Sequence, residues 1–198
     1  MQRAPREPKT ELRRNQLIDT ALEVFAQKGF AETTVKELAE AAGVAQGLLY
    51  HYFKSKDDLL EAVIERHSFL PQLRHILASP NQRPAKEVLS EVANGLYTLL
   101  DQKQDLVRIL LHESRTNPKV LEISHNLHQE VLQLLTRYLV ARINAGELRP
   151  HDANVTARCL VYTVPILYLT QRIFPSSQES AQQFIPELVE IILNGIMA

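Results

Sequence analysis

The stretch TTVKELAEAAGVAQGLLYHYFKSK, residues 33–56, decides the fold of this chain. Thr34 and Glu37 have the spacing of a capping box, in which a hydroxyl and a carboxylate satisfy each other's backbone donors at the start of a helix. Apolar residues then recur with helical spacing up to Ala42, and Gly43 follows, where a left-handed residue can end a helix. Because a second short helix begins near Gln46, the pattern predicts a helix-turn-helix with its tight turn at Gly43.

The second of these short helices has two unlike faces. Leu49 and Phe53 are one turn apart and predict its inner side, while Gly47, His51 and Lys54 point the opposite way. An outward face that is aromatic, cationic and locally free of side-chain bulk suits a phosphate backbone and a base edge. The pattern therefore predicts a helix that lies against DNA.

The run AGVAQGLLYHYFKSK, residues 42–56, resembles the signature of the TetR/AcrR family of one-component transcriptional repressors. The resemblance also includes the upstream TTVKELA and covers about the first 65 residues; beyond them it extends only to length and helical layout. It implies an all-α protein of about nine helices. We place an N-terminal arm and a three-helix DNA-binding domain in residues 1–56, and a helical ligand-binding and dimerisation domain in residues 57–198.

The resemblance and the outward placement together predict a set of DNA-binding residues. Gln46 opens the recognition helix and can form two hydrogen bonds to adenine, and no Arg lies on this helix, so readout would rest on Gln46, Tyr50 and DNA shape. Core packing is the alternative role for Tyr52, and helix capping for Thr34. The expected DNA contacts are Thr33, Thr34, Lys36, Ala45, Gln46, Gly47, Tyr50, His51, Tyr52, Lys54 and Lys56.

Three positions depart from the residues usual in that family. Ala45 stands where Ser is usual, so the recognition helix lacks its ordinary N-cap, a loss of roughly 0.5–2 kcal/mol. Gln46 is often Lys and Leu48 is often Thr. The last two departures leave the operator sequence open without removing the expectation of DNA binding.

Composition limits where this DNA affinity can come from. The formal net charge is −1, so the 198-residue chain is not basic overall and its DNA affinity must come from locally placed cations. The single cysteine, Cys159, excludes an internal disulfide and fits a reducing cytoplasm; since free cysteines are usually buried, we expect it in the core. No apolar run reaches membrane-spanning length. We expect a cytoplasmic protein with no membrane partner.

The rest of the chain reads as further helices. The arm with Arg3 and Arg6 is either a disordered terminus or a basic segment that reaches DNA. Pro71 lies within the expected length of the fourth helix and predicts a break or kink there, and Ser176 with Glu179 predicts the cap of the last helix. Outside the motif, the expected helices are 10–28, 56–67, 85–101, 106–113, 118–144, 153–174 and 178–197.

The last two expected helices are more apolar than one small subunit can bury. Nearly every residue between Cys159 and Leu169 is apolar, so a second copy of the chain is the economical partner. The resemblance likewise implies that these helices form the four-helix bundle of a homodimer. The expected interface residues are Leu160, Val164, Leu167, Phe184, Leu188, Ile191 and Ile192.

The resemblance also implies a pocket for a small, often apolar effector, whose binding changes the spacing between the two DNA-reading heads. The candidate lining residues, each of which also fits plain core packing, are Phe69, Tyr97, Leu100, His112, Tyr138 and Tyr162. His125 and His128 lie three residues apart, but no Cys or Asp cluster completes a metal site with them. We expect neither a metal nor a cofactor.

The sequence bears on three classes of function. The first is a dimeric repressor that a small molecule releases from a pseudo-palindromic operator of double-stranded DNA. The second is a DNA-binding regulator of the same fold that acts constitutively or through a protein partner. The third is a small helical enzyme, which we do not expect because the sequence contains no Gly-rich phosphate loop or nucleophile motif.

Overall fold

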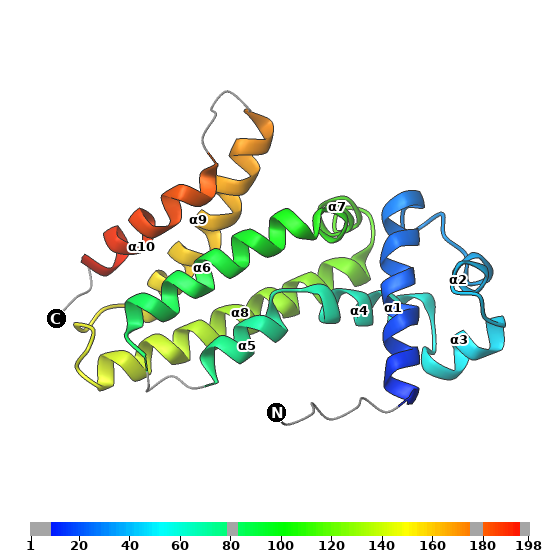
Figure 1. Cartoon of the computed structure of the whole chain (residues 1–198), viewed down its shortest axis with the longest axis horizontal. Coiled ribbons are helices and arrows are strands. Elements are labelled where there is room, and N and C mark those ends of the chain that lie inside the picture. The colour runs from blue at the N-terminus through cyan, green and yellow to red at the C-terminus, as the bar shows by residue number, and fades with distance from the viewer. Residues whose placement is uncertain (1–8, 79–82, 175–179, 195–198) are drawn as a thin grey trace, which may run out of the picture. The chain divides into compact units, whose positions relative to one another are not determined.

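The computed structural model describes residues 9–78, 83–174 and 180–194. Within these ranges the protein consists of helices joined by turns, with no strand (Figure 1), which confirms the all-α prediction. The helices are α1 Lys9–Lys28, α2 Val35–Ala41, α3 Gln46–Tyr52, α4 Lys56–His67, α5 Leu70–Leu77, α6 Ala85–Gln102, α7 Gln104–Glu113, α8 Pro118–Asn144, α9 Ala153–Ile173, the 3₁₀ helix η2 Ala181–Phe184, and α10 Ile185–Asn194. None of these helices is long and apolar enough to cross a membrane.

The chain folds into two compact units. The first contains the described residues up to His67 together with Asp105–Ser124, and the second contains Ser68–Gln104 and the described residues from His125 onward. Almost all of α7 and the first part of α8 therefore belong to the same unit as the helix-turn-helix. The domain boundary expected after residue 56 stays a prediction.

The first unit is built around α1. This helix packs against α2 and α4, and α2 packs against α3. The buried stripe of α1 includes Ile18 and Phe25, and the ring of Phe25 meets that of Phe30 edge to face, with 5.2 Å between centroids. Burying an apolar side chain of this size contributes roughly 1.5–3 kcal/mol, so α1 serves as the apolar support on which the two short helices rest.

Three glycines end helices as their positions predict. Gly29, Gly43 and Gly146 have φ values of +85°, +62° and +75°, a region that residues with a β-carbon rarely adopt. Gly43 makes the turn between α2 and α3, which confirms the predicted turn of the helix-turn-helix.

The capping box at the start of α2 is also present. The Thr34 hydroxyl accepts a hydrogen bond from the Glu37 N–H (3.2 Å), and Glu37 Oε2 accepts one from the Thr34 N–H (2.8 Å). Lys28 Nζ donates to the other Glu37 oxygen at 2.5 Å. The Lys28 hydrogen bond, followed by those from Thr34, lowers the pKa of Glu37 from its usual 4.5 to about 2. Glu37 therefore stays ionised in the folded protein under mildly acidic conditions.

This lowered pKa predicts an acid-sensitive contribution to stability. Because the folded-state pKa lies below the unfolded one, Glu37 stabilises the fold above pH 4.5, and this contribution is lost as the pH falls toward 2. In urea unfolding, wild type should exceed Glu37→Gln in stability at pH 6, and the difference should shrink by pH 3. Glu40→Gln is the control, because Glu40 forms an exposed ion pair with Lys36, which contributes little to stability. A difference that stayed constant with pH would contradict the assignment.

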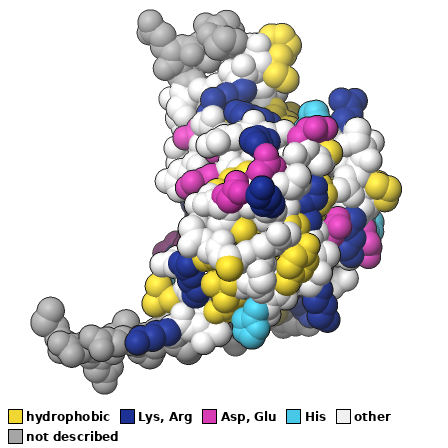
Figure 2. Space-filling view, turned by 90° about the vertical axis from the view of Figure 1, so that its right-hand side faces the viewer, with side chains coloured by type: hydrophobic (Ala, Val, Ile, Leu, Met, Phe, Trp, Pro, Cys, Tyr) yellow, Lys and Arg dark blue, Asp and Glu magenta, His cyan; other side chains and the backbone are white. Residues whose placement is uncertain are grey.

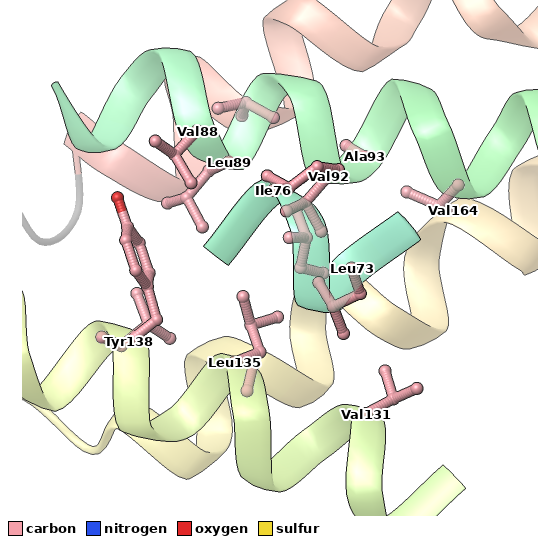
Figure 3. Close-up of a cluster of buried hydrophobic side chains, with 14 of the residues drawn as sticks. Leu73, Ile76, Val88, Leu89, Val92, Ala93, Val131, Leu135, Tyr138 and Val164 are labelled. Atoms are coloured by element: carbon pink, nitrogen blue, oxygen red, sulfur yellow. The ribbon is translucent and has the colours of Figure 1, made fainter. Parts of the chain in front are cut away.

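The second unit has one continuous apolar core. Its central helix, α6, packs against α5, α9 and α10. In Figure 3, side chains from α5, α6, α8 and α9 point toward one another, including Leu73, Val92, Leu135 and Val164. At the edge of this core the Tyr97 hydroxyl donates to Gln171 Oε1 at 2.8 Å, so the buried polar group is satisfied.

One helix boundary near a proline agrees with the sequence, and another differs from it. The predicted break near Pro71 is confirmed and produces a separate helix, α5, with Pro71 in its first turn. The helix expected over 178–197 is instead η2 followed by α10, in which Pro186 is the second residue, where its missing N–H costs nothing. The expected cap at Ser176 and Glu179, the helix end near Met197, and the arm residues Arg3 and Arg6 lie outside the described residues.

Candidate nucleic-acid interface

The short helix α3 presents the two faces that its sequence predicts. Leu49 and Phe53 are buried against the rest of the first unit. Gln46, Gly47 and His51 are exposed, and Tyr50 retains 52% of its surface. The exposed face therefore offers an amide, an imidazole and a phenol, all able to form hydrogen bonds with phosphate or base edges.

The first turn of α3 has no side-chain cap. Ala45 occupies the N-cap position with extended backbone angles (φ −69°, ψ 142°) and has no side-chain oxygen to accept a backbone N–H. This agrees with the sequence, where Ala replaces the usual capping residue.

Restoring the missing cap should stabilise the first unit. In Ala45→Ser the new hydroxyl can accept an N–H of the first turn, so the free energy of unfolding should rise by roughly 0.5–2 kcal/mol. Urea titration followed by circular dichroism measures it. Ala31→Ser, at an exposed position outside any helix, should leave stability unchanged. Equal stabilities of Ala45→Ser and wild type would show that α3 has no need of a cap.

Cations surround this face without forming one basic patch. Lys54 follows α3 and is exposed, and Lys36 on α2 is exposed with Glu40 at 3.8 Å. In Figure 2, which views the side where α2 and α3 lie in Figure 1, Lys and Arg side chains are separated by acidic and apolar ones. Thr34 is exposed beside Lys36 although its hydroxyl also serves the capping box. The charge available to phosphates is therefore local, as the net charge indicates.

Two expected DNA contacts are directed into the unit instead. Thr33 is 1% exposed, and its hydroxyl donates to the Gly29 carbonyl at 2.7 Å. Lys56 Nζ donates to the carbonyls of Phe30 (2.7 Å), Ala31 (3.2 Å) and Thr33 (2.7 Å). The prediction that Thr33 and Lys56 point outward to phosphates is wrong, because both polar groups are already engaged within the unit.

Tyr52 takes an intermediate position. It is half-buried, and its ring lies 5.2 Å from that of His51 and 6.4 Å from that of Phe53. This placement agrees with the packing role that the sequence leaves open for it, while its partial exposure keeps a phosphate contact possible.

Four of the six candidate effector residues lie together, and two lie elsewhere. Phe69, Tyr97 and Tyr138 are buried in the core of the second unit, with Leu100 half-buried against the same core. Burial raises the pKa of the Tyr138 hydroxyl, which accepts a hydrogen bond from Arg142 Nε at 3.2 Å. Two candidates lie apart from this group: Tyr162 is exposed on α9, and His112 is exposed on α7 in the first unit.

Tyr162 has a partner of its own. Its hydroxyl lies 3.0 Å from His128 Nε2, and the two rings stack with 5.4 Å between centroids. Partial burial, followed by the nearby charges of Arg158 and His125, lowers the pKa of His128. The imidazole is therefore neutral near pH 7 and can stack on Tyr162 without carrying a charge beside Arg158.

Apolar side chains remain exposed along α9 and α10. Leu160 and Val164 are only 3% and 0% exposed within the single subunit, so their assignment to a dimer interface is wrong: they pack in their own core. Leu167, Leu188 and Ile192 are half-buried against that core. The exposed apolar residues of the two helices and the segments next to them are Val155, Tyr162, Ile166, Ile173, Phe174, Phe184 and Ile191.

The exposed apolar residues of α9 and Cys159 share one side of the helix. Positions 155, 159, 162, 166 and 173 follow a spacing of three, four or seven residues, which aligns them along one stripe. Cys159 lies on this stripe and is exposed, so its expected place in the core is wrong. The sequence contained this spacing, but α9 is apolar on both sides and the pattern could not say which side faces outward.

Comparison with known proteins covers both halves of the chain. Residues 17–63 match the family described as "Bacterial regulatory proteins, tetR family", and residues 87–196 match the "AefR-like transcriptional repressor, C-terminal domain". The HTH-type transcriptional repressor KstR2 of Mycolicibacterium smegmatis is 42% identical over 189 residues, covering 93% of this chain and 90% of that protein.

Two further relatives are more distant. The HTH-type transcriptional regulator YerO of Bacillus subtilis is 25% identical over 93% of this chain, which spans only 65% of that protein's length. The crystal structure of FadR from Bacillus subtilis, in complex with stearoyl-CoA, superimposes with a TM-score of 0.73 at 25% identity, covering 92% of this chain and 98% of that one. The matches therefore include the helix-turn-helix and the helices that follow it.

Proposed function

Because the chain belongs to the TetR family of bacterial transcriptional regulators, we propose that it is a dimeric repressor that a small molecule releases from its operator. Its general role is that of a DNA-binding transcriptional repressor, and the family consists of regulators rather than enzymes. The proposal adds three specific parts to this role: the DNA-reading face, the dimer and the effector.

DNA recognition is assigned to the outward face of α3 and the residues around it. The observation that carries this assignment is that Gln46, Gly47, Tyr50 and His51 are exposed on a helix whose opposite side is buried. The N-terminal part of such a helix is the end that approaches base edges in the major groove. Around it we assign Thr34, Lys36, Ala45 and Lys54 to backbone contacts, with Tyr52 at the margin.

The dimer is proposed on the exposed apolar side of α9 and α10. Large apolar side chains gathered on the surface mark interaction sites, and a twin subunit would bury those of α9 and α10 by two-fold symmetry. The half-sites of the operator should then be related by the same symmetry, with centres one helical turn of DNA or a multiple of it apart.

The effector is proposed to be a small, largely apolar molecule that binds in the second unit. The apolar core there, with the hydroxyls of Tyr97 and Tyr138 at its margins, would suit an acyl chain with few polar groups. The relative FadR was crystallised with stearoyl-CoA, so acyl-CoA thioesters are the first class to test.

A mobility-shift assay on the DNA upstream of the chain's own gene tests these parts together. The protein should shift a fragment that contains a pseudo-palindrome, and an acyl-CoA of suitable length should abolish the shift while free coenzyme A does not. A shift that resisted a broad panel of acyl-CoAs and other apolar compounds would favour the alternative, a constitutive or protein-controlled regulator. Absence of any shift would reject the assignment of α3.

A further inference from the structure

The turn between α1 and α2 is held by two charged side chains that come from elsewhere in the first unit. Glu113, the last residue of α7, accepts a hydrogen bond from the Phe30 N–H at 3.1 Å. Lys56, the first residue of α4, donates to the Phe30 carbonyl at 2.7 Å. The N–H and the C=O of one residue are therefore bound by charges of opposite sign, an arrangement that we call the Phe30 clamp.

The acidic half of the clamp is deeply buried. Glu113 is only 4% exposed, and its Oε1 has the Phe30 N–H and, at 3.5 Å, the exposed His112 imidazole beside it. Burying a carboxylate is costly, and replacing buried charged groups by apolar residues of similar size is often neutral or stabilising. Glu113 is therefore better explained by the position that it imposes on the turn at Phe30 than by a contribution to the stability of the fold.

The basic half of the clamp is saturated. Lys56 Nζ has three N–H groups, and the carbonyls of Phe30, Ala31 and Thr33 accept all three. The ammonium also lies 4.4 Å from the centre of the Phe30 ring, within the range of a cation–π interaction. Such a lysine has no donor left for a phosphate.

The clamped turn leads directly into the reading helices. α2 begins two residues after Thr33, and α3 packs against α2, so the path of this turn sets the direction in which both helices leave α1. α7 lies in the segment Asp105–Ser124, which belongs to the first unit. The chain on either side of this segment, up to Gln104 and from His125 onward, belongs to the second unit. Glu113 thus ties the turn to a segment whose chain neighbours on both sides lie in the second unit.

We propose that Glu113 and Lys56 are positioning residues for operator binding, which fix the Phe30 peptide from both sides and so set the orientation of α2 and α3. Neither residue touches DNA. The proposal rests on the DNA-reading role of α3, and the tests below separate the two.

The acidic half is tested with Glu113→Ala and Glu113→Gln in the full-length protein. Glutamine keeps an oxygen that accepts the Phe30 N–H, so Glu113→Gln should bind the operator nearly as wild type does. Alanine removes the acceptor and should lower operator affinity roughly tenfold at 25 °C, with circular dichroism showing a folded protein. Glu122→Ala removes an exposed carboxylate of the same unit, which forms an ion pair with Lys119, and should change nothing.

The NMR signal of the Phe30 amide proton reports on the clamp in the absence of DNA. In Glu113→Ala the amide proton of Phe30 should shift upfield and exchange faster with solvent, whereas in Glu113→Gln it should stay close to wild type. A Phe30 amide unchanged by alanine, or equal operator affinities of alanine and wild type, would overturn the proposal. Failure of the wild-type protein itself to bind operator would reject the role of α3, while the amide signal would still report on the clamp.

The basic half is tested by salt dependence. A lysine that neutralises a phosphate contributes about one unit to the slope of log affinity against log salt. Lys56→Met should therefore lower operator affinity roughly tenfold and leave this slope unchanged, while Lys54→Ala should reduce the slope by about one unit. A reduced slope in Lys56→Met would show that Lys56 contacts phosphate and would overturn its place in the clamp.

Discussion

Replacing Ile191 by aspartate is expected to convert the dimer into monomers and to lower operator affinity by roughly 10²–10⁴-fold. Ile191 is 63% exposed on α10, so the subunit itself should tolerate the change. In the proposed dimer the same carboxylate would be buried in an apolar interface without a partner, which is strongly unfavourable. The loss in operator affinity follows because a monomer holds one half-site and loses the benefit of the second.

Sedimentation velocity and a mobility shift measure the two consequences. Ile191 is a sharper target than Leu188, because Leu188 is half-buried in its own subunit and an aspartate there would also disturb the fold. Val140→Asp is the matched control: Val140 is an exposed aliphatic residue of the second unit that belongs to α8, not to α9 or α10. Dimers of Ile191→Asp at micromolar concentration would contradict the proposed interface, as would monomers of Val140→Asp.

Tyr50→Ala is expected to weaken operator binding by roughly 10- to 100-fold while leaving the dimer intact. The phenol is 52% exposed on the outward face of α3 and can donate to a phosphate, and hydrogen bonds to charged groups contribute about 1.5–3 kcal/mol. Because half of the ring is already in water, its removal should cost the fold little.

Fluorescence anisotropy with an operator duplex measures the affinity, and sedimentation checks the dimer. Tyr50→Phe separates the hydroxyl from the ring: it should lose most of the affinity if the hydroxyl binds phosphate, and little if the ring packs on the sugar backbone. Leu121→Ala, at an exposed apolar position of the same unit on α8, is the control. An affinity of Tyr50→Ala equal to wild type would move the DNA contact to another face.

Local rules were sufficient to predict the helix-turn-helix. The capping box at Thr34, the left-handed turn at Gly43, the absent cap at Ala45 and the break near Pro71 each depend on residues within one or two helical turns. Such features are visible in a sequence because the interacting groups are neighbours in the chain. The expected boundaries of the helices from α1 to α4 agree with the structure for the same reason, whereas the last expected helix is η2 followed by α10.

The role of Lys56 could not be predicted in this way. The three carbonyls that accept hydrogen bonds from Lys56 lie more than 20 residues earlier in the chain. The other half of the Phe30 clamp, Glu113, lies still farther away in the sequence. Side-chain spacing within a helix shows only that Lys56 opens α4. Backbone carbonyls carry no residue-type signal, so a lysine that binds them looks like a lysine available to phosphate.

The outward side of α9 was ambiguous for a different reason. Leu160 and Val164 are as apolar as Val155 and Ile166, and a helix with two apolar sides gives no preference between core and interface. Only the packing of the second unit's core decides the matter, since it buries Leu160 and Val164 and leaves Ile166 61% exposed. The sequence predicts that α9 has more apolar residues than one subunit can bury, but it does not predict which of them are exposed.

The composition of α3 has a consequence for the search along the chromosome. The helix QGLLYHY contains neither Lys nor Arg, so it contributes little to non-specific electrostatic binding of DNA. A genome contains roughly 10⁶–10⁹ competing non-specific sites. If a regulator binds these sites weakly, a larger fraction of its molecules is free in solution. Few molecules per cell would then suffice to occupy one operator.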